Sequence, residues 1–355
     1  MLIYIILAIF MFGVLIAVHE WGHYIAAKRL GVRVNEFAIG MGPALWSKQK
    51  GETLYSLRAF PIGGFCAMEG EDEDTESPDS FSKKPLWRKL VILSAGSFMN
   101  FVAGLLLLLL LLSQSTAFAV PVIQNFAEGF PGQSEEGLLP GDRILSVDGR
   151  TVHIYNDVTL YFALSNGETM DLRIQRDGQV LERKDFPLKP REYTTNGHTQ
   201  LRYGLNFQTV EATPGRVLSE AWGTAGYFAR SVWLGLQMIA KGDAGMKDLA
   251  GPVGIVSMIG ETSVEAGTRG FSAGVMNLCY IIALVAVNLA IMNMLPIPAL
   301  DGGRIFLLLV GKGFHLLTRR ELNPKYEAYI HAVGFVLLIG LMVMVTFQDV
   351  VKLVR

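Results

Sequence analysis

Cysteine and charge are both scarce in this chain of 355 residues. Its two cysteines, Cys66 and Cys279, are far apart and form neither a CxxC pair nor a disulfide framework. A metal site would therefore have to use histidine and carboxylate ligands. Charged residues make up 18% of the sequence, below the roughly 25% of ordinary soluble domains. The net charge of -1 gives no indication of a nucleic-acid partner.

The N-terminus also lacks the basic residues and the small-residue cleavage site of a secretory signal. Its apolar run continues well past the usual length of a signal h-region and ends only at Lys28 and Arg29. We therefore expect a retained transmembrane helix over about 3–27. Three further segments are long and apolar enough to span a bilayer, and they lie at about 90–112, 275–297 and 329–347. The predicted fold class is a polytopic α-helical membrane protein with four transmembrane helices.

Basic residues are unevenly distributed among the connections between these spans. No lysine or arginine precedes the first span, whereas the connections between spans one and two and between spans three and four are rich in them. The positive-inside rule places these two connections in the cytoplasm. Both termini and the long connection after span two then face outward, although Lys352 and Arg355 oppose this orientation weakly.

The connections contain folded segments of their own. Residues 53–58 alternate apolar and polar side chains, which predicts a small β-element over 35–68 that dips toward the membrane; a cytoplasmic hairpin of no special role is the alternative. Residues 119–210 change to short strands and turns, typical of one compact extramembrane α+β domain. The amphipathic stretch 211–274 is expected on the membrane surface. The membrane core is then expected in two halves, 1–118 and 275–355.

His19, Glu20 and His23 form an H-E-x-x-H motif within the first apolar span. Residues four apart lie on one face of a helix, so both imidazoles can reach one metal ion. Glu20 can act as general base toward a metal-bound water. The motif alone also occurs by chance on soluble helices, but ionisable residues inside a span are costly and usually functional. The pattern predicts a zinc hydrolase whose active site lies within the membrane.

A catalytic zinc site usually has three protein ligands and one open position. Asp301 is the best candidate for the third ligand, because it follows an apolar span that Pro296 and Pro298 interrupt. It could instead be the N-cap of a helix that begins near Arg304. Glu69 and Asp349 are weaker candidates.

Asn100 and Asn293 are polar residues at the second and third apolar spans. Each could donate a hydrogen bond to the oxyanion of a reaction intermediate, or could join two helices through a hydrogen bond. The remaining histidines have no ligand-like spacing and are interpreted as surface or structural residues; they are His153, His198, His315 and His331.

Together these motifs resemble the site-2 protease family of intramembrane zinc metalloproteases, most closely its bacterial regulator-of-sigma-E protease branch. The resemblance covers nearly the whole chain. The family motif N-x-x-P-x-x-x-x-D-G fits at 293–302, and its G-x-x-x-N element fits at Gly96 and Asn100. Residues 40–43 resemble its G-F-G-P element, with Met41 in place of phenylalanine. Residues 120–210 resemble a PDZ domain, with Gly-Leu-Leu-Pro-Gly-Asp at 137–142 in the expected place.

The resemblance implies a Zn2+ cofactor held by His19, His23 and Asp301, with Glu20 as the catalytic base and with Asn293 and Asn100 as substrate-binding residues. The β-element would pair with an unwound substrate strand. Substrates would be single-span membrane proteins already trimmed by another protease, either anti-sigma factors or signal peptide remnants. The PDZ domain would filter substrates by size or bind their new C-termini. Well-known members of this branch carry two tandem PDZ domains, whereas the length between the spans here admits one.

The resemblance further implies a multi-pass protein of the bacterial cytoplasmic membrane. Its active site would lie toward the cytoplasmic side and its PDZ domain on the extracytoplasmic side. Two alternatives have a different chemistry. A proteolytically inactive metal-binding scaffold would have no need of Glu20, and a transporter is disfavoured by four spans without an inverted repeat.

Overall fold

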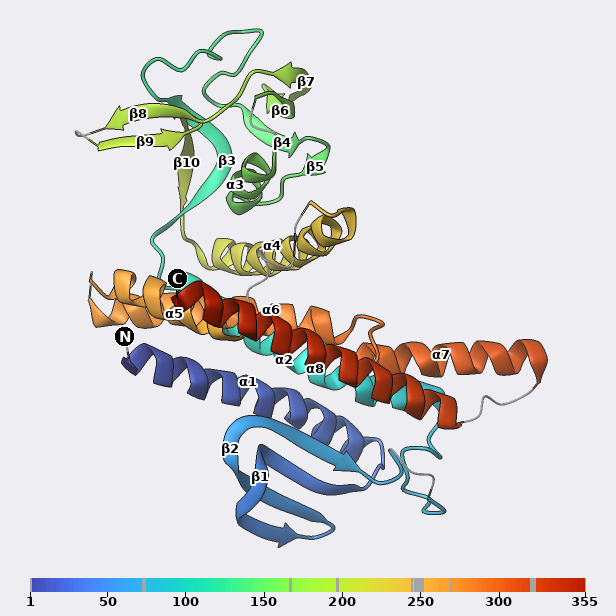
Figure 1. The fold of residues 1–355 in the computed structure, drawn as a ribbon. Helices are drawn as coiled ribbons and strands as arrows, with labels where there is room; N and C mark the ends of the chain where they lie inside the picture. Colours follow the sequence, from blue (N-terminus) through green and yellow to red (C-terminus); the bar gives the residue numbers. More distant parts are fainter. Residues whose placement is uncertain are drawn as a thin grey trace. The chain divides into compact units, whose positions relative to one another are not determined.

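Four long apolar helices dominate the chain (Figure 1). The computed structural model describes residues 2–71, 75–165, 168–195, 198–243, 245, 252–268, 270–319 and 324–354. Within these residues, four helices are long and apolar enough to cross a membrane, as the sequence predicted. They are α1 (Leu2–Arg29), α2 (Leu86–Leu112), α6 (Phe271–Asn293) and α8 (Pro324–Val354).

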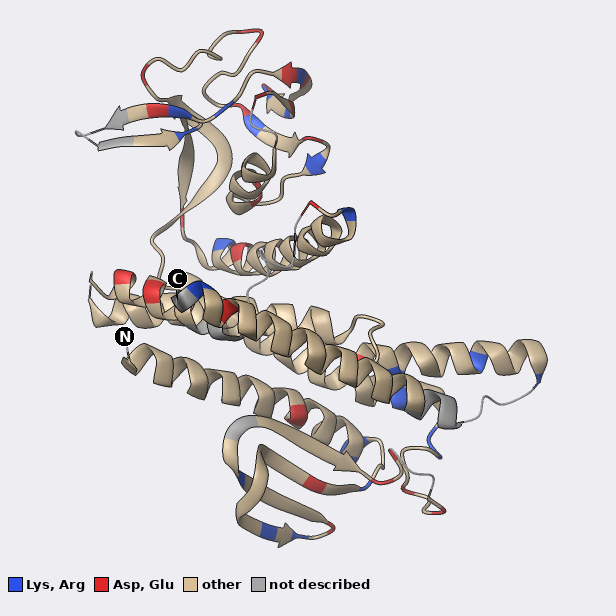
Figure 2. Cartoon of the chain, viewed as in Figure 1, with Lys and Arg blue, Asp and Glu red and all other residues tan. Residues whose placement is uncertain are grey.

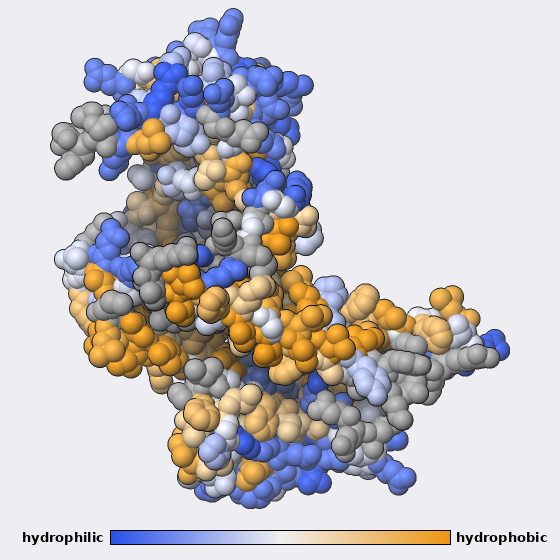
Figure 3. Space-filling model, in the orientation of Figure 1, coloured by the Kyte–Doolittle hydropathy of each residue, from blue (hydrophilic) through white to orange (hydrophobic). Residues whose placement is uncertain are grey.

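The third span differs from its predicted position at 275–297. Helix α6 begins at Phe271 and already ends at Asn293, because the following segment turns before Pro296 and its backbone is no longer helical. The long helices are almost free of charged residues in Figure 2, and hydrophobic side chains gather over them in Figure 3. This distribution is the one expected of helices that face lipid.

The chain divides into two compact units. Unit 1 comprises Met1–Leu108 and Phe228–Arg355, and unit 2 comprises Leu109–Tyr227. Three further helices belong wholly or partly to unit 1, namely α4 (Pro214–Lys241), which is shared between the units, α5 (Pro252–Gly267) and α7 (Asp301–Thr318).

Helix α1 packs against α5 and α6 in unit 1 through a cluster of buried side chains. Ala8 and Leu15 of α1 meet Ile259 of α5 and Leu278 and Ile282 of α6 in this cluster. A second cluster joins the C-terminal end of α1 to the β-element and to the start of α2. Together the two clusters hold α1 along its length, so that side chains on its buried face have fixed neighbours.

The β-element is larger than the sequence predicted. Strands β1 (Val34–Lys50) and β2 (Thr53–Met68) form a curled two-stranded sheet (Figure 1). The two halves of β2 pair differently with β1. Residues 54–57 pair with 36–39 and also with the end of β1 at 46–49, whereas within the described residues 64–68 pair only with 34–39. The predicted strand 53–58 is therefore an interior segment, and the segment 64–68 is an edge.

Unit 2 combines short strands with helix α3 and the first part of α4. The Asp177-Gly178 turn joins β6 to β7 as predicted, with positive φ angles of 48° and 82° at its two residues. The main sheet has the order β10-β3-β4-β6-β7, with β5 paired to β4, and β8 and β9 form a separate hairpin. The elements are β3 (Ala117–Phe126), β4 (Arg143–Val147), β5 (Arg150–Thr151), α3 (Tyr155–Leu164), β6 (Met170–Arg176), β7 (Gln179–Phe186), β8 (Arg191–Thr195), β9 (His198–Arg202) and β10 (Leu205–Glu211).

Candidate metal centre

His19 and His23 extend from the same face of α1, one helical turn apart. Helix α2 comes unusually close to them, because Gly22 faces it: a Cβ atom at this position would overlap the carbonyl oxygen of Ala95. His23 is only 6% exposed, and its Nδ1 lies 2.8 Å from the carbonyl oxygen of Ile92 in α2. The nitrogen Nε2 of His23 lies 3.2 Å from Nε2 of His19. Both rings thus present Nε2 to the same point.

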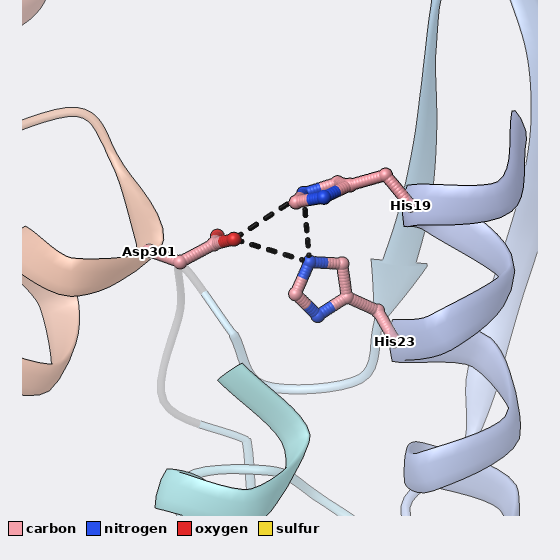
Figure 4. Close-up of side chains that lie close together, drawn as sticks. All are labelled: His19, His23 and Asp301. Atoms are coloured by element: carbon pink, nitrogen blue, oxygen red, sulfur yellow. Dashed lines mark hydrogen bonds and ion pairs between the residues drawn. The ribbon is translucent and has the colours of Figure 1, made fainter. Parts of the chain in front are cut away.

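Asp301 reaches this point from the other half of the core (Figure 4). It is the first residue of α7, whereas the N-cap position is occupied by Leu300, so the predicted alternative of an N-cap does not describe its side chain. Its Oδ2 lies 3.2 Å from His19 Nε2 and 3.4 Å from His23 Nε2. The carboxylate therefore faces the two imidazoles instead of its own helix.

The loop before Asp301 is held by close backbone packing. A Cβ atom at Gly302 would overlap the backbone of Met294, and one at Gly303 would overlap the carbonyl oxygen of Ile297. The backbone N–H of Ala299 donates to Nδ1 of His331 in α8 at 3.1 Å, and Ala299 has a positive φ of 75°. Pro296 and Pro298, the two glycines and His331 together fix a tight non-helical turn that aims Asp301 at α1.

The three ligand atoms fit a zinc ion. Zinc bonds of about 2.0–2.1 Å in a tetrahedron place neighbouring ligand atoms about 3.3 Å apart. The observed triangle has edges of 3.2, 3.2 and 3.4 Å. The carbonyl of Ile92 can only accept, so a neutral His23 carries its proton on Nδ1 and points a lone pair at Asp301. Oδ2 of Asp301 is buried and has no hydrogen-bond donor among the described residues. Two imidazole nitrogens and a carboxylate oxygen that converge in this way form a group that could hold a metal ion.

Glu20 lies beside the ligands and against the edge of the β-element. The backbone N–H of Cys66 in β2 donates to the carboxylate of Glu20. A Cβ atom at Gly64 would lie 3.4 Å from Cγ of Glu20. The edge segment 64–68 therefore runs directly past the residue expected to act as base.

The two asparagines occupy different surroundings. Asn100 is 1% exposed, and its Nδ2 lies 3.3 Å from Nδ1 of His19, on the side of the ring away from Asp301. Asn293 is half-buried at the end of α6, and its side chain has no hydrogen bond within the described part of the chain.

The weaker ligand candidates lie outside the cluster. Glu69 accepts a hydrogen bond from Asn35 at 2.8 Å, and this hydrogen bond lowers the pKa of its carboxyl. Asp349 accepts from the backbone N–H of Gly254 at 2.8 Å.

The remaining histidines are not part of the metal cluster found among the described residues. His153 is exposed and His315 is half-buried in α7, while the side chain of His198 lies outside the described part. The contact of His331 with the Asp301 loop had no signal in the sequence, because the two are joined only through tertiary packing.

Comparison with known proteins places the chain among metallopeptidases, in agreement with a metal site at His19, His23 and Asp301. The sequence matches peptidase family M50 over residues 7–341. The chain belongs to this family. The "Putative zinc metalloprotease CPE1693" of Clostridium perfringens is 36% identical over 350 residues, which cover 98% of each chain. The corresponding protein of Clostridium acetobutylicum, "Putative zinc metalloprotease CA_C1796", is 35% identical, with 98% of this chain and 97% of the relative covered.

A more distant M50 relative is the "Regulator of sigma-W protease RasP" of Bacillus subtilis. It is 26% identical over 431 aligned positions, which cover 98% of each chain. Because this alignment is longer than the 355 residues of the present chain, RasP carries segments that the present chain lacks. The clostridial relatives have no such excess of length. The chain is thus a membrane metalloprotease of a zinc-dependent family, in a short form.

Proposed function

We propose that this M50 protease cleaves a peptide bond within the transmembrane segment of a single-span membrane protein that another protease has already shortened. The observation that carries the proposal is the position of the ligand cluster. His19 and His23 lie on α1, which is itself a membrane-length helix, and Asp301 follows directly after another, α6. A protease built this way meets its substrate where the substrate also crosses the membrane.

The chain's own residues then have distinct tasks. Zinc held by His19, His23 and Asp301 would polarise the scissile carbonyl and make water acidic enough to attack at neutral pH. Glu20 accepts the proton of the attacking water and delivers it to the leaving amine. Asn293, whose amide is not engaged by another described side chain, is available to orient the substrate.

The β-element provides a way to hold an unwound substrate. A transmembrane helix hides its carbonyls in hydrogen bonds, and exposing them in lipid costs several kcal/mol for each unsatisfied group. Among the residues that the structure describes, the segment 64–68 has a paired strand on one side only, so a substrate strand could add to its other side and regain these bonds. Because this edge passes Glu20, the added strand would lie beside the metal ligands. The interior segment 54–57 is already paired on both sides and is not available.

We further propose that unit 2 is a PDZ-like domain on the extracytoplasmic side of the bacterial cytoplasmic membrane, with the connections between α1 and α2 and between α6 and α8 in the cytoplasm. Its place in the chain supports a role in selecting substrates by size or by their C-termini. The printed name of RasP connects that relative with sigma-W. By analogy, anti-sigma factor-like proteins are the first substrates to test here, followed by signal peptide remnants.

The decisive experiment compares wild type with Glu20→Gln on truncated single-span substrates in detergent, with bound zinc measured for both. We expect both proteins to hold zinc and only wild type to cleave, at bonds inside the membrane segment. Cleavage only outside that segment would refute the intramembrane site. Zinc retention by both without cleavage of any of several truncated substrates would favour the inactive scaffold.

Photocrosslinking tests the edge pairing separately. A benzophenone amino acid is placed at Phe65 in the segment 64–68 or, as the matched control, at Trp46 in the opposite part of the sheet, in the Glu20→Gln background. The substrate should crosslink from position 65 and not from position 46. Equal or reversed crosslinking would refute the assigned edge and leave the peptidase assignment intact.

A further inference from the structure

One face of α2 supports both histidine ligands. Ile92, Gly96 and Asn100 are spaced four residues apart and therefore lie along one face of the helix. The carbonyl of Ile92 contacts His23, and the amide of Asn100 contacts His19. A Cβ atom at Gly96 would overlap His23 Nε2 and would lie 2.7 Å from His19 Cε1. Only glycine lets the helix backbone approach the two ligand rings this closely.

The two contacts have the same geometry relative to the metal position. In each ring, Nε2 faces Asp301 and Nδ1 faces α2. A neutral histidine that binds zinc through Nε2 must carry its proton on Nδ1, and an acceptor at Nδ1 fixes that tautomer and the direction of the ring. The Ile92 carbonyl is such an acceptor for His23. His19 needs an acceptor too, and Asn100 is the neighbour in place.

We infer that Asn100 is a positioning residue whose Oδ1 accepts a hydrogen bond from Nδ1–H of His19 when zinc is bound. The nitrogen Nδ2 now faces His19, and Oδ1 is buried without a hydrogen-bond donor in the described part of the chain. A half-turn of the amide exchanges the two atoms and brings the oxygen to Nδ1. This role differs from the substrate contact expected from the sequence, because the amide lies on the far side of the ring from Asp301.

The test measures zinc affinity of the full chain in detergent by competition with a chelator, and the unfolding temperature of the zinc-free protein. The variants are Asn100→Leu, which removes the acceptor, and Asn100→Asp, which keeps it. Asn277→Leu is the matched control, since Asn277 also joins two helices inside an apolar span, donating to Thr262 Oγ1 at 3.2 Å, but lies near the opposite end of α6 from Asn293.

We expect Asn100→Leu to weaken zinc binding by about 10–100-fold, as is usual for loss of such a supporting contact. Asn100→Asp should bind zinc at least as tightly as wild type, and Asn277→Leu should lower only the unfolding temperature. Unchanged affinity in Asn100→Leu, an equal loss in Asn277→Leu, or a loss of tenfold or more in Asn100→Asp would each overturn the inference. Should Asn100→Leu not fold, Asn100→Asp decides alone.

The inference rests on the part of the proposed function in which His19, His23 and Asp301 hold zinc. Its failure is nevertheless distinguishable from failure of that proposal. Wild type that binds zinc and loses it in Asp301→Asn, while Asn100→Leu has no effect, would refute only the role of Asn100. Wild type and Asp301→Asn with the same zinc affinity would refute the ligand set itself.

Discussion

Unit 1 and unit 2 each contain an aspartate with a buried carboxylate oxygen, and the two carboxylates have opposite surroundings. Asp142 in unit 2 is fully buried and accepts from the backbone N–H of Leu139 at 2.8 Å and from Arg176 at 2.8 and 2.7 Å. Asp301 in unit 1 points one oxygen at two ring nitrogens and has no hydrogen-bond donor for it among the described residues. The first carboxylate is satisfied by donors of the protein, and the second lies with His19 and His23 in a group that could hold a metal ion.

The comparison separates a carboxylate that the protein itself satisfies from one that we propose as a metal ligand. The pair of Asp142 and Arg176 has bidentate geometry, and the hydrogen bond to Asp142 raises the pKa of Arg176. Arg176 also donates to the carbonyls of Glu135 and Gly137, which clamps the loop before β4. Polar groups that the protein satisfies in this way hold a fold together. Groups left converging and unsatisfied mark a ligand site.

The largest effect is expected at Asp301. Asp301→Asn removes the charge of the proposed third zinc ligand, so the zinc affinity should fall by more than the roughly 100-fold that supporting residues can cost, and cleavage should become undetectable. The unfolding temperature of the zinc-free protein should stay close to the wild-type value, because asparagine has the shape of aspartate and keeps an oxygen acceptor beside the two imidazoles. Zinc content, cleavage and unfolding of the zinc-free protein check this. A zinc-free variant much less stable than zinc-free wild type would break the comparison.

Asp142 should behave in the reverse way. Asp142→Ala leaves Arg176 without its charged partner, which typically costs about 3–5 kcal/mol. Hydrogen exchange in β4 and β6 should report this loss of stability, while zinc affinity stays at the wild-type value. Loss of zinc in this variant would show that the two carboxylates are not independent.

The sequence predicted that Asp301 lies beside His19 and His23, and the structure brings the three residues together. H-E-x-x-H in an apolar span is governed by local helix geometry, and the two prolines before Asp301 mark a helix that ends, so a distant carboxylate could be predicted to meet the two histidines. The edge of the β-element could not be predicted, because the two halves of β2 pair with different parts of β1 and this pairing depends on how the sheet curls. The contact between His23 and the carbonyl of Ile92 could not be predicted from the sequence either. Every residue has a backbone carbonyl, and only the packing of α2 on α1 decides which one lies beside His23.

Asp349 is an intermediate case, with a smaller expected effect. It is 2% exposed near the end of α8 and accepts from the backbone N–H of Gly254 in the first turn of α5. The carboxylate thus acts as an N-cap supplied by another helix, and Asp349→Ala should cost about 0.5–2 kcal/mol, the usual range for a lost cap. Asp349→Asn, which keeps an acceptor, should cost less. Thermal unfolding measures both, and zinc affinity should not change in either.

Glu36 in the β-element should give the smallest effect, and the effect should depend on pH. Its carboxylate accepts from Ser56 at 2.6 Å and from Arg58 at 2.7 Å. Burial raises the pKa of Glu36, but the hydrogen bonds from Ser56 and Arg58 outweigh burial and hold the pKa below its ordinary value. The charged form is therefore favoured by folding. Its contribution is complete above the ordinary glutamate pKa of about 4.3 and is lost as the pH falls through the lower folded-state pKa.

A partly exposed ion pair of this kind is worth up to about 1 kcal/mol. The difference in hydrogen-exchange protection of β1 between wild type and Glu36→Gln, measured at each pH so that intrinsic exchange rates cancel, should therefore be small and constant near neutrality. It should shrink only below about pH 4, where wild type becomes protonated as well. A difference that grows toward acid would mean that the neutral carboxyl is the favoured form. The hydrogen bonds from Ser56 and Arg58 would then not outweigh the burial of Glu36, and its carboxylate would not stabilise the fold as we expect the carboxylate of Asp142 to do.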